Sequence, residues 1–310
     1  MPSKRIDTVL FSIIVPTYNR ANLLKIAIQS VVNQTYTNWE LIIVDDGSMD
    51  HTRQIVTAYQ QDARIKYLHQ ANQERSLARN RGILEASGSY ICFLDDDDYL
   101  LENHLMTFWE AIEKYPSPLM ILRTGFYRKK GAQSYPSDQY RKSRDGHPVR
   151  FAAFHFCSAC TLCIPAIFLE EDQFAPSFRH WQDTHLILRL LAKHPFRQLP
   201  THTYIYVHHP IMGSQTIYNF PDARNRIQNN VDAIKDLFKE HGELVRPILP
   251  ARTEAFLVAQ KYLDHAHGAL KFGNRRMAWE LFRFSWETST SSRLLVSRGK
   301  FVVKALCSKF

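Results

Sequence analysis

Four consecutive carboxylates, Asp95–Asp98, stand directly after an apolar run, ICFL at 91–94. Adjacent carboxylates repel one another, and apolar surroundings make each of them costlier to ionise. A divalent cation among them would supply the missing opposite charge. Mg²⁺ and Mn²⁺ use one or two protein carboxylates and take their other ligands from phosphate oxygens and water. The run therefore indicates a metal–diphosphate site; the alternative is an acidic turn exposed to solvent.

Two other polar segments also follow apolar runs. WELIIV (39–44) ends in DDGS, which contains Asp45 and Asp46, and FSIIV (11–15) ends in PTYNR, which contains Tyr18. In open α/β sheets, ligands bind outside the carboxyl ends of the strands. If the three apolar runs are neighbouring parallel strands, Tyr18, Asp45, Asp46 and Asp95–Asp98 converge at one edge of the sheet.

The segments between these runs have helical patterns. Leu24, Ile28 and Val31 predict a helix over 19–34, with Asn19 as its N-cap. Further helices are expected over 52–59 and 76–86, with a short strand at 65–68 before the second. Strands that alternate with helices through short loops predict an α/β fold, a mostly parallel sheet flanked by helices.

The composition fits one large domain or a domain with an appendage. The chain has 310 residues, of which 45% are apolar and 22% charged. No stretch approaches the roughly 18–20 apolar residues of a membrane span. The N-terminal MPSKRIDTVLFSIIV reads as a first strand rather than a signal peptide. Five cysteines without a sign of export favour reduced thiols and a cytoplasmic location.

Three cysteines lie close together in CSACTLC. A zinc or iron–sulfur site built on Cys157, Cys160 and Cys163 would need a fourth ligand, and none stands at a suitable spacing. We therefore predict buried structural thiols on a β-strand that opens the second half of the domain.

The motifs together resemble a known family. FSIIVPTYNR, WELIIVDDGSMD, SLARNRGI and GSYICFLDDDDYL, in this order, resemble the family 2 glycosyltransferases, with their GT-A fold, over roughly residues 10–215. No glycine-rich phosphate loop of the dinucleotide-binding or P-loop kind is present, which disfavours a nicotinamide enzyme or an NTPase.

The resemblance implies roles for the residues at the strand ends. Pro16 and Tyr18 match positions that line the nucleotide base. Asp46 matches the aspartate that hydrogen-bonds the base, and Asp45 matches its supporting neighbour. These residues would bind the nucleoside of a sugar donor.

The acidic run overlies the family's DxD element. The resemblance implies that Asp95 and Asp96 approach the ribose while Asp97 binds Mn²⁺ or Mg²⁺. Arg75 and Arg79 lie in the segment that reaches toward the donor diphosphate and sugar. NQERS replaces the family's glycine-rich lead-in there, and Arg79 has the alternative role of bracing the fold.

The second half should serve the acceptor. Gln182–Asp183 resembles the family's acidic ED element, whose Asp acts as general base in inverting members; the alternative is that Asp183 only caps its helix. Should Asp183 not be the base, His180 or His185 on the same segment is the next candidate. The resemblance also suggests His209, ahead of His208, as a metal ligand or as a partner for the charge of departing UDP.

From about residue 222 the family pattern stops and helical periodicity continues. We predict a glycosyltransferase domain over 1–221, with a nucleotide-sugar half at 1–115 and an acceptor half at 116–221, and a helical extension over 222–310. The last forty residues hold nine basic and two acidic residues, a net +7 of the chain's +9. The alternatives for this segment are a surface that meets anionic lipid headgroups or a phosphorylated acceptor, an oligomer contact, and a solvated helical face. It carries no nucleic-acid-binding motif.

The sequence thus predicts a metal-dependent, inverting glycosyltransferase. It would move a sugar from a nucleotide-diphosphate donor, with a UDP-sugar favoured, to a hydroxyl of a glycan, a lipid-linked or another acceptor in polysaccharide or glycoconjugate synthesis. The expected location is the cytoplasm, with peripheral contact at the inner face of the plasma membrane. The alternatives are a nucleotidyltransferase and a non-catalytic protein of this fold that binds sugar nucleotides or membranes.

Overall fold

The computed structural model describes residues 9–116, 118–137, 146–155, 157–208 and 223–307. The chain divides into two compact units. The sheet unit comprises Met1–Ser177 and Leu186–His208, and the helical unit comprises Phe178–His185 and His209–Phe310. The predicted domain boundary at 221/222 lies outside the described residues.

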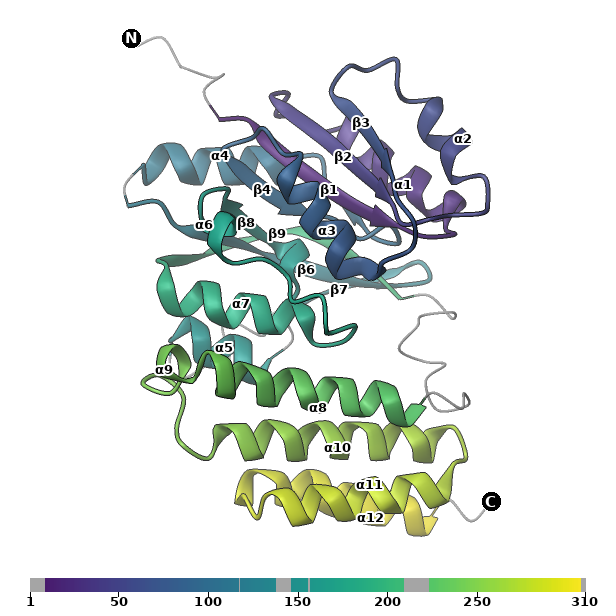
Figure 1. The fold of residues 1–310 in the computed structure, drawn as a ribbon, viewed down its shortest axis with the longest axis vertical. Coiled ribbons are helices and arrows are strands. Elements are labelled where there is room, and N and C mark those ends of the chain that lie inside the picture. The colour runs from purple at the N-terminus through teal and green to yellow at the C-terminus, as the bar shows by residue number, and fades with distance from the viewer. Residues whose placement is uncertain (1–8, 117, 138–145, 156, 209–222, 308–310) are drawn as a thin grey trace. The chain divides into compact units, whose positions relative to one another are not determined.

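The sheet unit is built on one sheet of nine strands (Figure 1). Four strands from the first part of the chain pair in parallel, and β8 then joins β4 antiparallel. The predicted α/β fold is confirmed, with the parallel part in the first half and mixed directions in the second. The order is β3 (Ile65–His69), β2 (Trp39–Asp45), β1 (Phe11–Thr17), β4 (Tyr90–Phe93), β8 (Leu162–Pro165), β6 (Ile121–Lys130), β9 (Phe196–Val207) and β5 (Tyr99–Leu100), with β7 (Gln133–Pro136) paired to β6.

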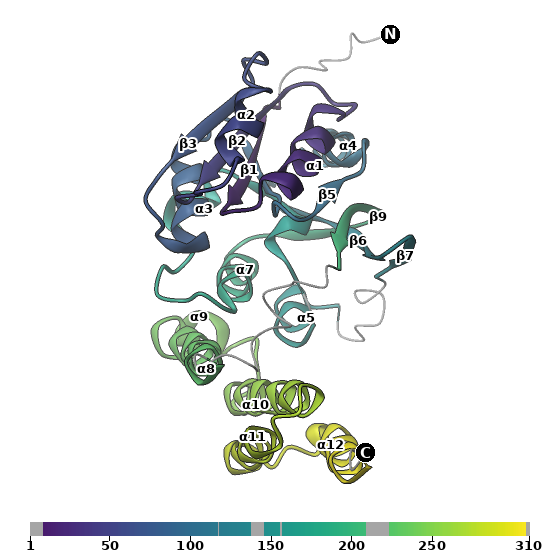
Figure 2. The ribbon, with the colours of Figure 1, turned by 90° about the vertical axis from the view of Figure 1, so that its right-hand side faces the viewer.

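The strand order reverses between β1 and β4. The chain runs outward from β1 through β2 to β3 and then returns past β1 to β4. Because parallel crossovers are right-handed, this reversal sends the connecting helices to opposite faces of the sheet. Figure 2 shows α1 and α3 on opposite faces. Ligands of such folds bind at the carboxyl ends of the strands beside this switch point. The helices of this part are α1 (Ala21–Val32), α2 (Thr52–Thr57), α3 (Glu74–Leu84) and α4 (His104–Lys114).

Apolar burial explains why these elements form. Every residue of β1 and β2 is buried, as expected of strands covered on both faces. Leu24, Ile28 and Val31 of α1 are fully buried, as their spacing predicts. Helix α3 approaches β1 so closely that a Cβ on Gly82 would lie 2.4 Å from Cγ2 of Ile14. Only glycine fits this contact without displacing the helix.

Two local predictions are wrong. Asn19 does not cap α1: it has φ 52°, its Oδ1 accepts from Met49 N at 2.7 Å, and its own N–H donates to Ser48 Oγ. The residue thereby joins the loops after β1 and β2 instead of starting the helix.

The cysteine run is not one strand. Cys157 precedes a short 3₁₀ turn that holds Cys160, and only Cys163 lies on β8, beside Cys92 of β4. The four cysteines are buried, and burial raises the pKa of Cys163 well above its usual value. The prediction of buried thiols is confirmed, although the strand is shorter than expected.

The rest of the sheet unit holds α5 (Pro148–Phe154) and α6 (Phe168–Glu171), and α7 (Gln182–Lys193) crosses from one unit into the other. The helical unit contains α8 (Ala223–Glu240), α9 (Gly242–Val245), α10 (Thr253–Lys271), α11 (Arg275–Thr288) and α12 (Leu295–Cys307), which confirms the predicted helical C-terminal region. Its core includes Leu263, Ala278, Leu281 and Phe301. Among the described helices none is long and apolar enough to span a membrane.

A buried histidine ties α4 to β9. His104 is fully buried, its Nδ1 lies 2.7 Å from Thr203 Oγ1, and burial lowers its pKa to about 3. The folded chain therefore holds this imidazole neutral over a pH range in which the unfolded chain protonates it, since the usual pKa is about 6.5. As the pH falls from about 6.5 toward 3, protonation of this imidazole in the unfolded chain therefore lowers the free energy of unfolding.

We predict that His104→Gln flattens the acid dependence of stability. At about pH 4.5 the wild type should have lost roughly 2 kcal/mol through this residue alone, and Gln, which keeps a polar side chain but takes up no proton, should not show that loss. Urea unfolding at neutral and acid pH measures the difference. His51→Gln removes an exposed histidine of the same unit and is the control. Equal acid sensitivity of wild type and His104→Gln would contradict the assignment.

Candidate functional site

The carboxyl ends of β1 and β4 border a cavity of about 440 Å³. It lies at the switch point of the sheet, and its walls come from the loops after β1, β2 and β4 and from the start of α3. The structure thus brings together most of the residues predicted for the donor site. Six of them line the cavity: Pro16, Tyr18, Asp46, Arg75, Asp95 and Asp96.

The two carboxylates after β2 are held by hydrogen bonds. Asp46 is buried, and its Oδ1 accepts from Gln70 Nε2 at 2.7 Å and from Gln73 N at 2.9 Å. Asp45 points the other way: it accepts from Ser48 N at 2.8 Å and from Tyr67 Oη at 2.5 Å. Asp46 therefore faces the cavity in a fixed position, while Asp45 holds the loop that carries it.

Asp95 forms the first ion pair of the acidic run. Arg79 is completely buried on α3 and donates from Nη2 to Asp95 Oδ1 at 2.7 Å. Burial by itself would raise the pKa of Asp95, but the charges of Arg79 and Arg75 outweigh it and keep that pKa below its usual value. Phe174 covers the Arg79 guanidinium at 5.0 Å, and Arg79 is not among the residues that line the cavity.

Arg20, at the start of α1, bridges the next two carboxylates. Its Nη1 lies 2.9 Å from Asp96 Oδ1 and 2.9 Å from Asp97 Oδ2, and Thr17 Oγ1 donates to the other oxygen of Asp96. Burial nevertheless raises the pKa of Asp96 to about 6, and burial and the neighbouring Asp95 raise that of Asp97. The cluster holds more negative charge than its arginines neutralise.

The sequence motifs did not indicate roles for Arg20 and Thr17. Both stand inside the quoted segment PTYNR, so the signal was present, but the motif attributed the site to Pro16 and Tyr18. A basic residue placed three positions after the strand end, facing an acidic run, could have identified Arg20.

Asp98 is the last carboxylate of the run, and its hydrogen-bond partners lie on β9. It is buried, accepts hydrogen bonds from Tyr204 Oη and, at 2.8 Å, from Val207 N, and burial raises its pKa well above the usual value. Carboxylate oxygens of Asp95, Asp97 and Asp98 lie within 4.8 Å of one another. Oxygen ligands at this spacing suit a divalent cation, which would supply charge that compensates Asp97 and Asp98, whose pKa values are raised by burial and by the neighbouring Asp95. The predicted ligand His209 lies outside the described residues.

Asp183 lies in the first turn of α7, in the part of that helix grouped with the helical unit. The helix begins at Gln182, after Trp181 with φ 63°, so Asp183 is not the N-cap residue. Its carboxylate can still favour the helix through the positive end of the helix dipole. Of the other base candidates, His185 is buried with Nε2 3.1 Å from Asp236 Oδ2, a position that suits packing of α7 against α8.

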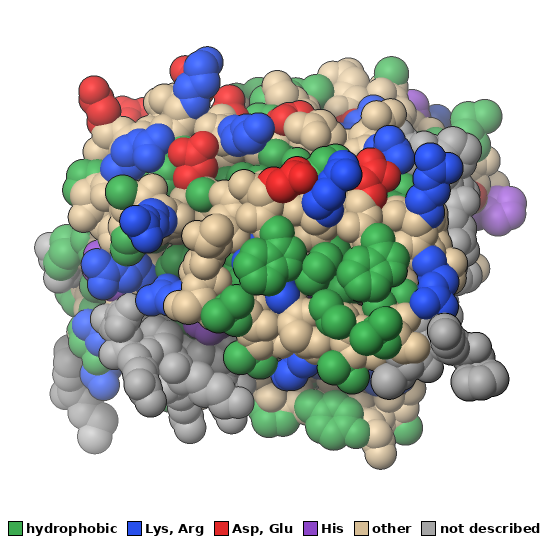
Figure 3. All heavy atoms as spheres, turned by 90° about the horizontal axis from the view of Figure 1, so that it is seen from below, with side chains coloured by type: hydrophobic (Ala, Val, Ile, Leu, Met, Phe, Trp, Pro, Cys, Tyr) green, Lys and Arg blue, Asp and Glu red, His purple; other side chains and the backbone are tan. Residues whose placement is uncertain are grey.

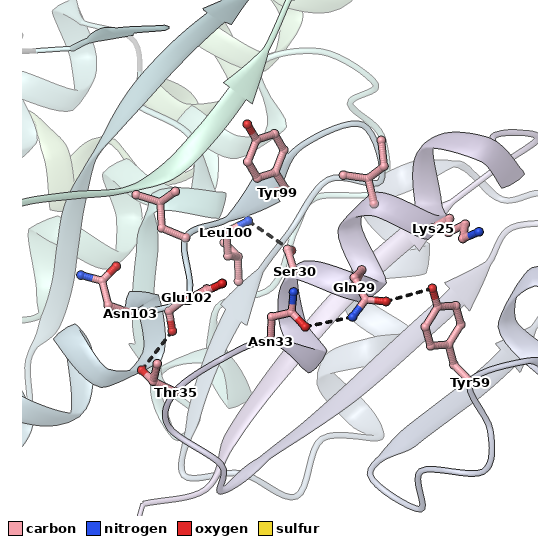
Figure 4. Close-up of a pocket in the computed structure, with 12 residues that line it drawn as sticks. Lys25, Gln29, Ser30, Asn33, Thr35, Tyr59, Tyr99, Leu100, Glu102 and Asn103 are labelled. Carbon is pink, nitrogen blue, oxygen red and sulfur yellow. Dashed lines mark hydrogen bonds between the residues drawn. The ribbon is translucent and has the colours of Figure 1, made fainter.

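A larger cavity, of about 780 Å³, lies along α1 and the segment between β5 and α4 (Figure 4). Lys25 and Glu102 are its only charged lining residues. Gln29 bridges Tyr59 and Asn33 within it, and Ser30 Oγ accepts from Leu100 N. Because its polar groups bond to one another and it lacks an acidic cluster, the smaller cavity is the better candidate for chemistry.

A mixed sheet of this order, with carboxylates at the switch point between β1 and β4, defines a GT-A-type α/β domain. The chain belongs to glycosyl transferase family 2, whose family model matches residues 12–219.

Relatives and solved structures agree with this membership. The uncharacterized glycosyltransferase RC0461 of Rickettsia conorii is 41% identical over 198 residues, which are 62% of this chain and 32% of that protein. Rickettsia prowazekii RP339, also an uncharacterized glycosyltransferase, is 29% identical over 76% of this chain and 72% of its own length. The chain spans less than two fifths of the length of the first curated relatives that it matches.

Two solved structures share the fold at low identity. S. aureus TarS 1-349 in complex with UDP-GlcNAc has a TM-score of 0.64 and 18% identity, over 95% of this chain and 81% of that one. The Pyrobaculum calidifontis mannosyltransferase PcManGT, in complex with GDP-Man and Mn²⁺, has a TM-score of 0.53 and 17% identity, over 96% of this chain and 86% of that one.

We predict that Asp97→Ala removes the Mn²⁺-dependent part of UDP binding without unfolding the chain. The raised pKa of Asp97 means that its ionised form is unfavourable in the fold; this penalty is present at neutral pH and disappears below the usual pKa of about 3.8. The variant without metal should therefore melt at or above the wild-type temperature at pH 7. Calorimetry with UDP, with and without Mn²⁺, measures the binding.

Asp62→Ala is the matched control, because Asp62 forms a surface pair with Arg64 and has a lowered pKa. It should keep the Mn²⁺ dependence and lose a little stability. If Asp97→Ala bound UDP with the wild-type Mn²⁺ dependence, Asp97 would not be a metal ligand.

Proposed function

We propose that the chain is a metal-dependent, inverting glycosyltransferase that takes a sugar from a nucleotide-diphosphate donor, a UDP-sugar being favoured. One observation carries this proposal: a single cavity at the switch point of the sheet is lined by carboxylates and an arginine. They are Asp46 after β2, Asp95 and Asp96 after β4, and Arg75 of α3. Membership of the family, and neighbours of the same fold whose structures hold UDP-GlcNAc or GDP-Man, support it.

The donor would lie across the ends of β1, β2 and β4. The base would pack by Pro16 and Tyr18 and donate a hydrogen bond to the Asp46 carboxylate, whose orientation Gln70 and Gln73 fix. Asp96 would reach the ribose. The diphosphate would then lie toward Arg75, whose charge offsets that of the phosphates.

Two of the acidic residues would hold Mn²⁺ or Mg²⁺. Asp97 and Asp95 have oxygens within 4.8 Å of one another and of Asp98, which also accepts a hydrogen bond from Tyr204. Charge on the departing diphosphate would be neutralised by the bound cation. Arg79, buried and paired to Asp95, would position that carboxylate rather than touch the donor.

The acceptor hydroxyl must lose its proton as its oxygen attacks the anomeric carbon. In our proposal the Asp183 carboxylate takes this proton. The new bond joins the acceptor oxygen to the anomeric carbon, the bond from that carbon to the diphosphate breaks, and the nucleoside diphosphate leaves. Attack from the face opposite the leaving group inverts the anomeric configuration.

For the acceptor, we propose a glycan, lipid-linked or other hydroxyl compound of polysaccharide or glycoconjugate synthesis. A place in the cytoplasm, with peripheral contact at the inner face of the plasma membrane through the basic C-terminal region, is part of the same proposal.

A thermal-shift screen of nucleotide sugars with and without Mn²⁺ tests the donor, because a ligand that binds only the folded state raises the melting temperature. UDP-sugars should give the largest shift, and only with the metal. Donor hydrolysis that releases UDP would support transfer of the sugar. Release of pyrophosphate would indicate a nucleotidyltransferase, and binding without turnover of any donor would indicate a non-catalytic protein.

We predict that Asp183→Asn separates catalysis from stability. Asn has nearly the same shape but accepts no proton at neutral pH, so turnover should fall by about 10²–10⁴-fold while donor affinity stays unchanged. The loss of one first-turn charge should cost less than about 1 kcal/mol of unfolding free energy. Glu254→Gln removes a first-turn carboxylate from α10 and is the control for that charge. Wild-type turnover in Asp183→Asn would rule this residue out as the base.

A further inference from the structure

Helices α11 and α12 expose a set of large apolar side chains on one face of the helical unit. We call it the α11/α12 face. Figure 3 shows hydrophobic side chains gathered on this side of the molecule, with lysines and arginines along their margins. The face consists of Trp279 and Trp286 from α11, 39% and 40% exposed, and Leu295, Val296, Val303 and Leu306 from α12, 49–69% exposed.

The exposed apolar side chains of the α11/α12 face are distinct from those that pack in the core of the helical unit. Phe301 and Ala305 of α12 are completely buried and pack in the helical core. At 3.6 residues per turn, the four exposed apolar residues of α12 fall within an arc of about 100°, on a side of the helix that the core residues do not use. The helix is therefore apolar on two sides, although only one of them is needed for folding.

The two tryptophans are held in place. Trp279 packs edge-on against Phe301 with ring centroids 5.3 Å apart, and the Arg298 guanidinium lies 4.1 Å above the Trp286 ring. Arg275 at the start of α11 donates to Ala305 O near the end of α12 at 2.8 Å. These contacts fix both tryptophans against α12 and join the start of α11 to the end of α12.

The charge around this face is strongly positive. Both acidic residues of α11 lie beside arginines, since Glu280 pairs with Arg224 at 2.8 Å and Glu287 with Arg283 at 3.3 Å. The exposed cations of the two helices and the turn between them outnumber these acids: Arg275, Arg276, Arg283, Arg293, Lys300 and Lys304.

We propose that the α11/α12 face binds the surface of an anionic phospholipid bilayer. An apolar side with tryptophan, flanked by lysine and arginine, is the pattern of helices that lie in the membrane interface. The apolar side chains would enter the boundary between headgroups and acyl chains, while the long basic side chains reach the lipid phosphates. Tryptophan suits this depth because its ring is apolar and its N–H polar.

A second copy of the chain fits this face less well. Two copies related by a twofold axis would set the same lysines and arginines against one another, and like charges across an interface are unfavourable. An anionic membrane has the opposite charge. Charge complementarity therefore selects the membrane.

The inference rests on the peripheral membrane position in the proposed function and assigns it to a defined surface. It does not depend on sugar transfer, because vesicle binding is measured without donor or acceptor. A chain that binds vesicles and transfers no sugar would refute the proposed reaction only. A chain that transfers sugar and ignores vesicles would refute this inference only.

The test is flotation of the full chain with vesicles of phosphatidylglycerol and phosphatidylcholine. The wild type should bind these mixed vesicles and should bind vesicles of phosphatidylcholine alone at least about tenfold more weakly. Its binding to the mixed vesicles should fall as the salt concentration rises. Val296→Glu with Val303→Glu should reduce partitioning by about tenfold or more, since both side chains are 61–69% exposed and the change adds repulsion from anionic lipid. Circular dichroism confirms that the variant is folded.

Leu84→Glu with Ile167→Glu is the matched control. It replaces two exposed apolar residues of the sheet unit and should bind vesicles as the wild type does. Equal binding by the wild type and the Val296/Val303 variant would overturn the proposal. A lipid-free dimer in sedimentation analysis that Val296→Glu with Val303→Glu dissociates would also overturn it, because the face would then be a contact between copies.

Tryptophan fluorescence gives a second readout. Brominated phosphatidylglycerol should quench the emission of vesicle-bound protein through Trp279 and Trp286. Trp39 and Trp109 are buried in the sheet unit, and Trp181, before α7, is half-buried. The double variant Trp279→Phe and Trp286→Phe should still bind but lose most of the quenching. Undiminished quenching in that variant would place another part of the chain in the bilayer.

Discussion

The electrostatic repulsion among Asp95–Asp98 is the constraint on which the arrangement of the site depends. Four carboxylates at one strand end are stable only where opposite charge reaches them. Arg20 comes from the start of α1 and Arg79 from α3, helices that lie on opposite faces of the sheet (Figure 2). The reversal of strand order beside β4 makes this possible, because it sends one helix to each face. Even so, burial raises the pKa of Asp96 to about 6, so the folded cluster favours a further cation.

Much of the sheet unit follows from local sequence. Apolar runs that end in polar loops predicted β1, β2 and β4, because strands buried on both faces need continuous apolar sequence. The short strand β3 was also predicted, although it is mostly half-buried. In the second half of the sheet unit, local patterns did not predict how the strands pair. β6 pairs with strands from two distant segments, β8 and β9, and β5 has two residues, so their places depend on contacts that no local pattern records. Asn19 failed as a cap for the same reason: its partners, Ser48 and Met49, lie in another loop.

The site residues that directly follow the strands could be predicted from the sequence, whereas contacts between residues far apart in the chain could not. The carboxylates stand in two visible motifs, and the structure places Asp46, Asp95 and Asp96 around one cavity. Of their partners, Arg20 could have been inferred only from its place just after β1, because it lies 77 positions from Asp97. Tyr204 could not be inferred, because it lies 106 positions from Asp98 and in no quoted motif. The apolar face of α11 and α12 was similarly hidden. Helical periodicity indicated both helices, but which side each one buries is decided by the core that they form together.

The central claim is that a nucleoside diphosphate and a divalent cation bind together at the switch point between β1 and β4. Crystals grown with UDP and Mn²⁺, with diffraction measured at the manganese absorption edge, locate both directly. We expect an anomalous peak within bonding distance of an Asp97 oxygen and the uracil beside Asp46. A peak away from the acidic run, or UDP in the larger cavity lined by Lys25 and Glu102, would contradict it.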